Sequence, residues 1–271
     1  MQNRKPLVLV RGGGDLASGA ILRLHRAGLN VVVSELPQPL AVRRAVSFAE
    51  AVYEGRHIVE GTEARLVERD QIPRVLEAGE VPVLIDPDAD VLTHLPFPVV
   101  VDARLAKQPP APLPVEIPLY VGLGPGFNAG ENCHAVVETR RGHTLGRVHW
   151  QGPAQADSGQ PEGDPHRVLR APSEGTLTGR IRIGEHVEAG DEIALIGGRT
   201  PVTSPLSGVL RGILHDGLHV TRGLKIGDVD PRDDPSACFL VSDKALAIGG
   251  GVLEAILTTV DIRKKLFGFQ G

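Results

Sequence analysis

The chain has 271 residues, of which 33 are glycine and 22 are proline, whereas only six Phe, two Tyr and one Trp are present. A hydrophobic fraction of 41% excludes intrinsic disorder, and the shortage of aromatic rings argues against a nucleic-acid binder that stacks bases. A net charge of −4, without a basic half or tail, leaves no electrostatic footprint for a phosphate backbone.

The sequence also limits the expected location of the protein. The first apolar run, residues 7–11, is too short for the core of a signal peptide, and no apolar stretch approaches the ~18 residues of a membrane span. Cys133 and Cys238 cannot form a disulfide framework and fit a reducing compartment. We therefore expect a cytoplasmic protein with no nucleic-acid or membrane partner.

The N-terminal region predicts a strand–helix–strand unit. Residues 7–10 form a continuous apolar run, as in a strand that is buried on both faces. A glycine turn follows at 12–14, and apolar residues then recur at helical spacing until Gly28. The run 31–33 predicts a second, parallel strand, which completes a βαβ unit.

Further elements extend this unit to an expected Rossmann-like domain over residues 1–150 with a parallel α/β sheet. The patterns predict a helix over 40–54, a hairpin over 57–67, a helix near 70–78, strands at 82–86 and 99–102, a proline-rich extended crossing at 109–118, a strand at 119–121, and a hairpin from 135–138 and 145–150.

The second half of the chain contains an internal repeat. After a polar segment at 151–166, which we interpret as a linker or loop, eight residues of 175–193 recur without a gap 33 positions later. This predicts a duplicated β domain over 167–235 that resembles the barrel-sandwich hybrid of biotinyl and lipoyl domains. The stretch 197–202 lacks the lysine that those carriers modify, so a structural or docking role is favoured. The segment 236–271 predicts a C-terminal helix, either broken or closely packed at its three glycines 249–251.

The strongest motif follows the first strand. Gly12-x-Gly14-x-x-Ala17 opens the first helix, and Glu35 ends the next strand. In a dinucleotide-binding unit Gly12 allows the tight turn, Gly14 admits a pyrophosphate, and Glu35 accepts from a ribose hydroxyl. This favours NAD or a related nucleotide as ligand. The alternative is that the glycines serve only helix–sheet packing.

Other residues extend this candidate cofactor site. Gly13 belongs to the same turn, and Asp15, which would repel a pyrophosphate, is expected to cap the helix or to face a metal ion. A second loop is expected either to offer amides to an anion or to be a plain turn, and it contains Gly122, Gly124 and Gly126. Asp102, Arg104 and Lys107 follow another strand end and are expected to converge on the same cleft, or else to be surface charges.

No catalytic residue and no metal site can be assigned. Cys133 and His134 lack the further ligands of a zinc site, so an inert, buried cysteine is favoured. Whether the chain is an enzyme stays open. An NAD-dependent oxidoreductase with Asp102, Lys107 or His134 as proton donor is one alternative, and a non-catalytic scaffold is another.

A family resemblance rests on several segments together. Residues 10–19, 24–28, 35–44, 48–55, 122–127, 137–139, 141–147, 230–232 and 242–251 are similar to the selenium-dependent molybdenum hydroxylase accessory proteins (YqeB family). The first domain also resembles the XdhC accessory proteins, which handle molybdenum cofactor before its insertion. The resemblance implies a maturation factor that binds a nucleotide or molybdenum cofactor, with a molybdenum hydroxylase or its maturation machinery as partner; a homo-oligomer is left open.

Overall fold

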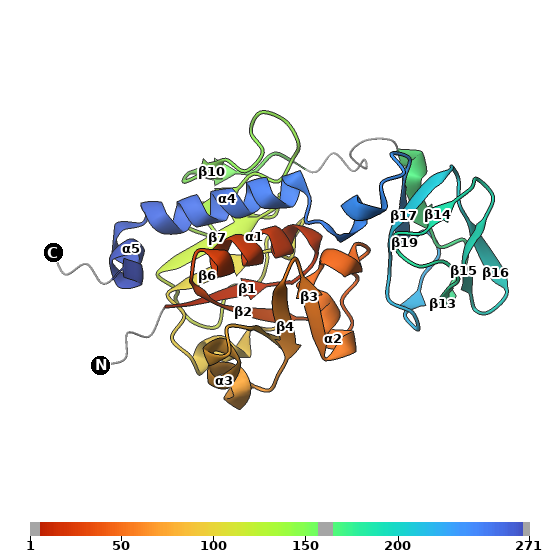
Figure 1. Cartoon of the computed structure of the whole chain (residues 1–271). Coiled ribbons are helices and arrows are strands. Elements are labelled where there is room, and N and C mark those ends of the chain that lie inside the picture. Colours follow the sequence, from red (N-terminus) through yellow and green to blue (C-terminus); the bar gives the residue numbers. More distant parts are fainter. Residues whose placement is uncertain (1–5, 157–164, 268–271) are drawn as a thin grey trace.

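The computed structural model describes residues 6–156 and 165–267, which form a large α/β part and a smaller β-rich part (Figure 1). Within these residues, a nine-stranded sheet has the order β10-β9-β7-β6-β1-β2-β5-β4-β3. Its strands are β1 (Leu7–Arg11), β2 (Asn30–Glu35), β3 (Arg56–Val59), β4 (Thr62–Leu66), β5 (Val81–Ile85), β6 (Val99–Asp102), β7 (Leu119–Leu123), β9 (Ala135–Val137) and β10 (Val148–His149). The expected mixed α/β fold with a mainly parallel sheet is confirmed.

The direction of chain progression reverses at β1. β1 pairs in parallel with β2 on one side and with β6 on the other, so the chain builds one half of the sheet and then returns to the centre. Only the outermost strands, β3 and β10, pair antiparallel to their neighbours. Such a reversal leaves a crevice outside the carboxyl ends of the central strands.

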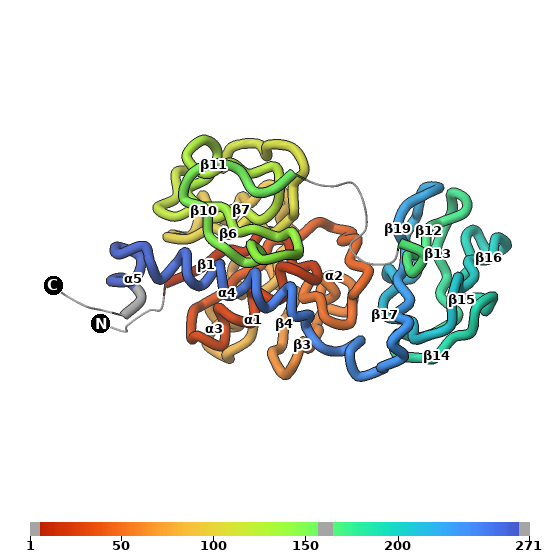
Figure 2. Tube along the Cα trace, turned by 90° about the horizontal axis from the view of Figure 1, so that it is seen from above, coloured from red at the N-terminus to blue at the C-terminus, as the bar shows by residue number. Residues whose placement is uncertain are grey.

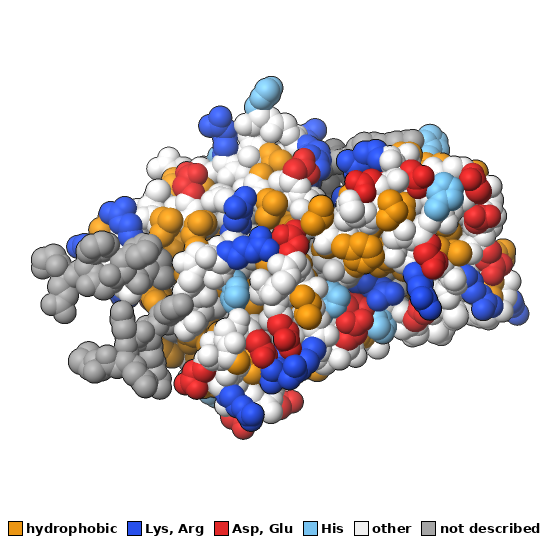
Figure 3. Space-filling view, viewed as in Figure 1, with side chains coloured by type: hydrophobic (Ala, Val, Ile, Leu, Met, Phe, Trp, Pro, Cys, Tyr) orange, Lys and Arg blue, Asp and Glu red, His pale blue; other side chains and the backbone are white. Residues whose placement is uncertain are grey.

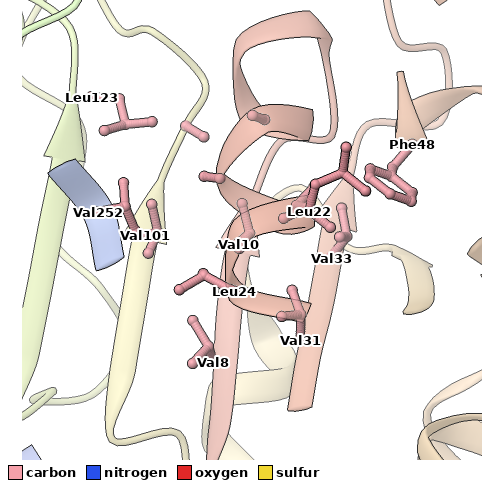
Figure 4. Packing of buried hydrophobic residues seen from close by; sticks show 14 of the residues in the cluster. Val8, Val10, Leu22, Leu24, Val31, Val33, Phe48, Val101, Leu123 and Val252 are labelled. Carbon is pink, nitrogen blue, oxygen red and sulfur yellow. The ribbon is translucent and has the colours of Figure 1, made fainter. Parts of the chain in front are cut away.

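Both faces of the sheet are covered. Alternate residues of a strand point to opposite faces: Val8 and Val10 pack beneath α1 (Asp15–Arg26) and α4 (Asp243–Thr258), whereas Leu9 packs into a second core. Figure 4 shows Leu22 of α1 between Val10 and Val33, Leu24 between Val10 and Val8, and Val252 beside Val101. The second core includes α3 (Ile72–Glu77) and the short helix η4 (Asp90–Thr93).

The glycines of the C-terminal helix are closely packed, and the helix is not broken at them. A Cβ on Gly249 would lie 2.4 Å from the Gly19 carbonyl oxygen of α1, and one on Gly251 would lie 2.1 Å from the Gly146 carbonyl oxygen. Gly250 faces open space instead. α4 therefore belongs to the large part, although it follows the β-rich part in sequence (Figure 2); α5 (Val260–Phe267) continues it.

The predicted helix over 40–54 is wrong. This segment forms two 3-10 turns, η1 (Arg44–Val46) and η2 (Phe48–Glu50), and one short helix, α2 (Ala51–Glu54). The amide of Phe48 donates to the Ser18 hydroxyl, and the amide of Ala49 donates to the Gly13 carbonyl. These bonds to the glycine turn and α1 replace the hydrogen bonds that a continuous helix would need.

The repeat of period 33 is confirmed element by element. β13 (Gly175–Gly179), β14 (His186–Val187) and β15 (Glu192–Ile196) correspond to β17 (Gly208–Ile213), β18 (His219–Val220) and β19 (Lys225–Asp230). β14 pairs with β17 and β18 pairs with β13, so the two halves exchange strands. β12 (Val168–Arg170) and β16 (Thr200–Thr203) complete the two four-stranded sheets of this part.

Half of the expected linker at 151–166 lies outside the described residues, which omit 157–164. Before this gap, β11 (Gly152–Pro153) pairs with β8 (Asn128–Ala129), so residues up to 153 still pack on the large part. Among the described helices, none has the length and apolar character required to cross a membrane.

Candidate functional site

A cavity of about 730 Å³ lies where the two parts of the molecule meet. The large part contributes the carboxyl ends of β1, β2 and β6 and the start of α1, and the β-rich part contributes Arg167, Arg211, Lys225 and Asp228. The crevice expected at the reversal of strand order is thus closed on one side by the repeat. Both parts of the chain are needed to form this cavity.

The glycine turn presents the start of α1 to the cavity. Gly12 has a φ of +88° and its amide donates to the Ser34 carbonyl, which aligns β1 with β2. Ser18 has the first amide that bonds back along the helix, to the Gly14 carbonyl. The amides of residues 14–17 therefore make no such bond, and they form the positive end of the helix dipole. Gly14, which precedes the helix, lines the cavity, as does Ala17.

Gly14 differs from its neighbours in the space around it. A Cβ on Gly14 would meet no atom within 4 Å, whereas one on Gly13 would lie 2.9 Å from the Ala49 amide nitrogen. Gly13 is therefore required by packing. Gly14 leaves room in the cavity for a ligand to approach the backbone, as the motif predicts.

Glu35 binds the glycine turn directly. Its Oε1 accepts from the Gly13 amide at 2.6 Å and its Oε2 accepts from the Leu36 amide at 2.8 Å. Burial raises the pKa of Glu35, while these two backbone hydrogen bonds oppose the shift. Glu35 lines the cavity as expected, but both of its oxygens already hold backbone amides, so in this arrangement it fixes the turn.

Asp15 pairs with Arg43, which also binds the segment between β19 and α4. Arg43 donates to Asp15 Oδ1 at 3.1 Å and to the carbonyls of Ala237 and Leu240 at 3.1 and 2.9 Å. The Asp15 side chain does not cap the helix. The pair offsets the negative charge that would otherwise repel an anion at the start of α1.

The residues after β6 reach the cavity only in part. Arg104 and Lys107 line it, whereas Asp102 is completely buried behind Arg104. Asp102 accepts from Arg104 Nε at 2.8 Å and from the Tyr120 hydroxyl at 3.0 Å. Its hydrogen bond raises the pKa of Arg104, which keeps this guanidinium charged at the cavity wall. The predicted convergence on one cleft is confirmed for Arg104 and Lys107.

The cavity is rich in positive charge, although the whole chain is acidic. Its described lining contains ten basic residues, Arg11, Arg43, Arg104, Lys107, Arg140, Arg141, Arg167, Arg211, Lys225 and Lys244. It contains four acidic residues, Asp15, Glu35, Asp86 and Asp228. On the face of the molecule in Figure 3, by contrast, basic and acidic side chains are interspersed over both parts. Such a cationic cavity attracts polyanions.

The second glycine loop lies behind the cavity wall. Pro125 lines the cavity, but Gly122, Gly124 and Gly126 are not among its lining residues. A Cβ on Gly122 would lie 2.1 Å from the Phe127 ring, and one on Gly126 would lie 2.4 Å from the Gln108 carbonyl oxygen. Close packing accounts for these two glycines.

The described residues contain no group of three or more His, Cys, Asp or Glu that could hold a metal ion. Cys133 is buried, and burial raises the pKa of its thiol to about 11. His134 Nδ1 accepts from the Tyr120 amide at 3.0 Å, so it binds the residue before β9 to β7. His215 stacks on Tyr53 and bonds to the buried Glu50 at 2.7 Å across the two parts.

Sequence reasoning missed the contribution of the β-rich part. Arg167, Arg211, Lys225 and Asp228 lie far along the chain from the glycine motif, and their placement depends on how the two parts pack. A sequence signal does exist: at the positions equivalent to Arg211, Lys225 and Asp228, the first repeat has Thr178, Glu192 and Leu195. The repeat thus loses its symmetry where it faces the cavity.

Solved structures provide only weak comparisons. An aspartoacylase family protein of Mesorhizobium loti is 10% identical, with a TM-score of 0.27 over 83% of this chain and 84% of that chain. The ectoine utilization protein EutE (DoeB) of Ruegeria pomeroyi is 13% identical, with a TM-score of 0.25 over 83% of this chain and 85% of that chain. At these scores the similarities carry no argument about function.

Sequence comparison is more informative. No family model matches the chain. The chain is, however, 46% identical over 256 residues to YqeB of Escherichia coli K12, an uncharacterized protein. The match covers 93% of this chain and 47% of YqeB, so the chain spans about half the length of this relative. The expected similarity to YqeB is therefore confirmed for the region that the chain covers.

Proposed function

We propose that the chain binds a nucleotide or another pyrophosphate-bearing compound, such as molybdenum cofactor, in the cavity between its two parts. We further propose that it acts as an accessory factor in the maturation of a selenium-dependent molybdenum hydroxylase. The observation that carries the binding proposal is the cationic cavity onto which the start of α1 opens beside Gly14. The maturation role rests on the family resemblance.

The strand order supports this interpretation. We interpret the large part as Rossmann-like, because β9, β7, β6, β1, β2 and β5 follow the order 6-5-4-1-2-3 of a doubly wound sheet. We interpret the β-rich part as barrel-sandwich-like, because its two repeats exchange strands. In this fold a pyrophosphate binds at the N-terminus of the first helix.

The glycine turn and the side chains around it would have different roles in binding. Helix amides at residues 14–17 would donate to a pyrophosphate, and Arg104 would neutralise its charge. Glu35 would act through Gly13, because its carboxylate fixes the turn. Arg43 offsets the charge of Asp15, which permits an anion to approach.

The experiment is a calorimetric titration of the full chain with NAD, FAD, ATP and molybdopterin. The test variant is Gly14→Val, which adds a side chain to open cavity space. The control is Gly250→Val, which also meets no atom within 4 Å but lies on α4 outside the cavity lining. Saturable binding that is lost in Gly14→Val and kept in the control supports the proposal. Absence of binding to every compound, or equal binding by both variants, contradicts it.

Two further assays distinguish this proposal from the alternative functions, an oxidoreductase and a scaffold. An NAD-dependent oxidoreductase would oxidise NADH in the presence of a small carbonyl substrate, which absorbance at the nicotinamide band reports. Of its three candidate proton donors, only Lys107 lines the cavity. A scaffold would capture a partner protein equally well with and without the Gly14→Val substitution.

A further inference from the structure

The β-rich part presents its own group of charges to the cavity, on strands β17 and β19 and, at Arg167, directly before β12. Arg167 donates to both oxygens of Asp228, at 3.0 and 2.8 Å. Arg211 approaches Asp228 and Asp230 only to 3.8 Å in each case. Asp230 is itself engaged by Arg232, which lies outside the cavity lining. The two carboxylates are therefore already paired with other arginines.

Two cations of this group, Arg211 and Lys225, make no hydrogen bond to a carboxylate among the described residues, and Arg211 has only its two long ion pairs. The Arg211 Nε is buried and has no hydrogen-bond partner among the described residues. Lys225 has no ion pair with them either, and its side chain is exposed toward the cavity. Surrounding protein atoms lower the pKa of Lys225 by desolvation. A buried donor without a partner carries a free-energy cost that a bound anion would relieve.

Backbone irregularities aim these side chains. In the first repeat, β13 and β15 pair without interruption from Leu177 to Gly179. In the second repeat, the register of β17 against β19 shifts between Leu210 and Gly212, so Arg211 occupies a bulge. A second shift in register, between Leu169 and Arg170 of β12, lies where β12 pairs with β19 and Arg170 is opposite Lys225. Bulges re-aim side chains and recur beside functional sites.

The contrast between the repeats shows that this group is not required by the fold. The first repeat builds the same strands with Thr178, Glu192 and Leu195 at the positions of Arg211, Lys225 and Asp228. Packing alone thus tolerates neutral or acidic residues at these positions. The two positive charges, Arg211 and Lys225, occur only in the copy that faces the cavity.

We infer that Arg211 and Lys225 form a second oxyanion subsite, so that the ligand of the cavity carries two anionic groups, one at the start of α1 and one at the repeat. This rests on the proposed function for the first subsite. The ligand class is then a pyrophosphate compound that bears a further phosphate or carboxylate at its other end. Such a ligand contacts both parts of the chain and stabilises their packing.

The test is a calorimetric titration with inorganic pyrophosphate, which is too short to occupy both subsites at once. We expect two molecules bound per chain in the wild type. We expect one pyrophosphate per chain in Gly14→Val, which blocks the site at the start of α1. We also expect one in Lys225→Gln, where the site at the start of α1 remains and keeps its affinity. Removing one charged contact weakens a site about tenfold or more. Arg222→Gln is the matched control, because it removes an exposed charge three residues away, outside the cavity lining.

The outcomes separate this inference from the proposed function. A single pyrophosphate in the wild type that Lys225→Gln leaves unaltered, or equal effects of Lys225→Gln and Arg222→Gln, overturns the second subsite alone. A site that is lost in Lys225→Gln together with no effect of Gly14→Val overturns the first subsite alone. A variant whose midpoint temperature of thermal unfolding equals that of the wild type has kept its fold.

Discussion

The crossing of α1 and α4 allows a quantitative test of how the C-terminal helix is held. Gly249→Ala places a methyl group 2.4 Å from the Gly19 carbonyl oxygen and 2.6 Å from its carbonyl carbon. Both atoms belong to the backbone of α1, so they cannot move aside as a side chain would. Gly250→Ala makes the same chemical change one residue later, where no atom lies within 4 Å.

The two substitutions differ in a single contribution to stability. Each replaces a helical glycine by alanine, which stabilises a helix by about 0.8–1 kcal/mol. Overpacking of a tight contact costs about 1–3 kcal/mol. Because the gain in helix propensity is common to both, the difference between them isolates the steric cost. Gly250→Ala should therefore raise the free energy of unfolding by about 1 kcal/mol, and Gly249→Ala should lie about 1–3 kcal/mol below it.

Thermal unfolding followed by circular dichroism measures this difference. For a chain of this size, about 1 kcal/mol shifts the melting temperature by about 2–4 °C. We expect the Gly249→Ala midpoint to lie at least about 2 °C below that of Gly250→Ala. Equal midpoints, or a higher midpoint for Gly249→Ala, would refute the close crossing of the two helices.

Three further results are expected. Arg43→Ala removes the donor to the carbonyls of Ala237 and Leu240 and should cost about 3 kcal/mol in urea unfolding; an unchanged midpoint would contradict this bridging role. Burial raises the pKa of the Cys133 thiol to about 11. At pH 8 about one Cys133 side chain in a thousand should therefore be a thiolate, and a thiol reagent should label it only after unfolding. Rapid labelling of the native chain would refute this expectation. Hydrogen bonds to Asp233 and Glu188 raise the pKa of His186 to about 9. The charged imidazole therefore stabilises the fold at pH values below its ordinary pKa of 6.5, and this stabilisation is lost as the pH rises through 9. An NMR titration should show the midpoint of His186 falling in Asp233→Asn, and an unchanged midpoint would count against the pair.

Local patterns predicted most of the elements correctly. The strands of the parallel sheet are continuous apolar runs because both faces are buried, and the hairpin over 57–67 turns at Glu60 and Gly61. The repeat offset predicted two copies of a unit of short strands, and the structure has three strands in each copy. These features depend on neighbouring residues, so the sequence is enough to reveal them.

Features that depend on distant contacts could not be predicted. The segment 40–54 has helical periodicity, but its amides at Phe48 and Ala49 donate to the Ser18 hydroxyl and the Gly13 carbonyl, and the segment forms short turns instead. Glu35 was expected to accept a hydrogen bond from a ribose hydroxyl, whereas in the structure its carboxylate accepts from the Gly13 amide. Arg211 and Lys225 line the same cavity as the glycine turn because the two parts pack together, as at Gly212, where a Cβ would lie 2.5 Å from the Val42 carbonyl oxygen.

The most direct test of ligand binding is native mass spectrometry of the purified full chain, alone and after addition of pyrophosphate-bearing compounds. We predict that the wild type retains one such compound, that Gly14→Val loses it, and that Gly250→Val keeps it. A chain that retains none of these compounds, or wild-type and Gly14→Val spectra that show the same bound mass, would contradict a ligand site at the start of α1.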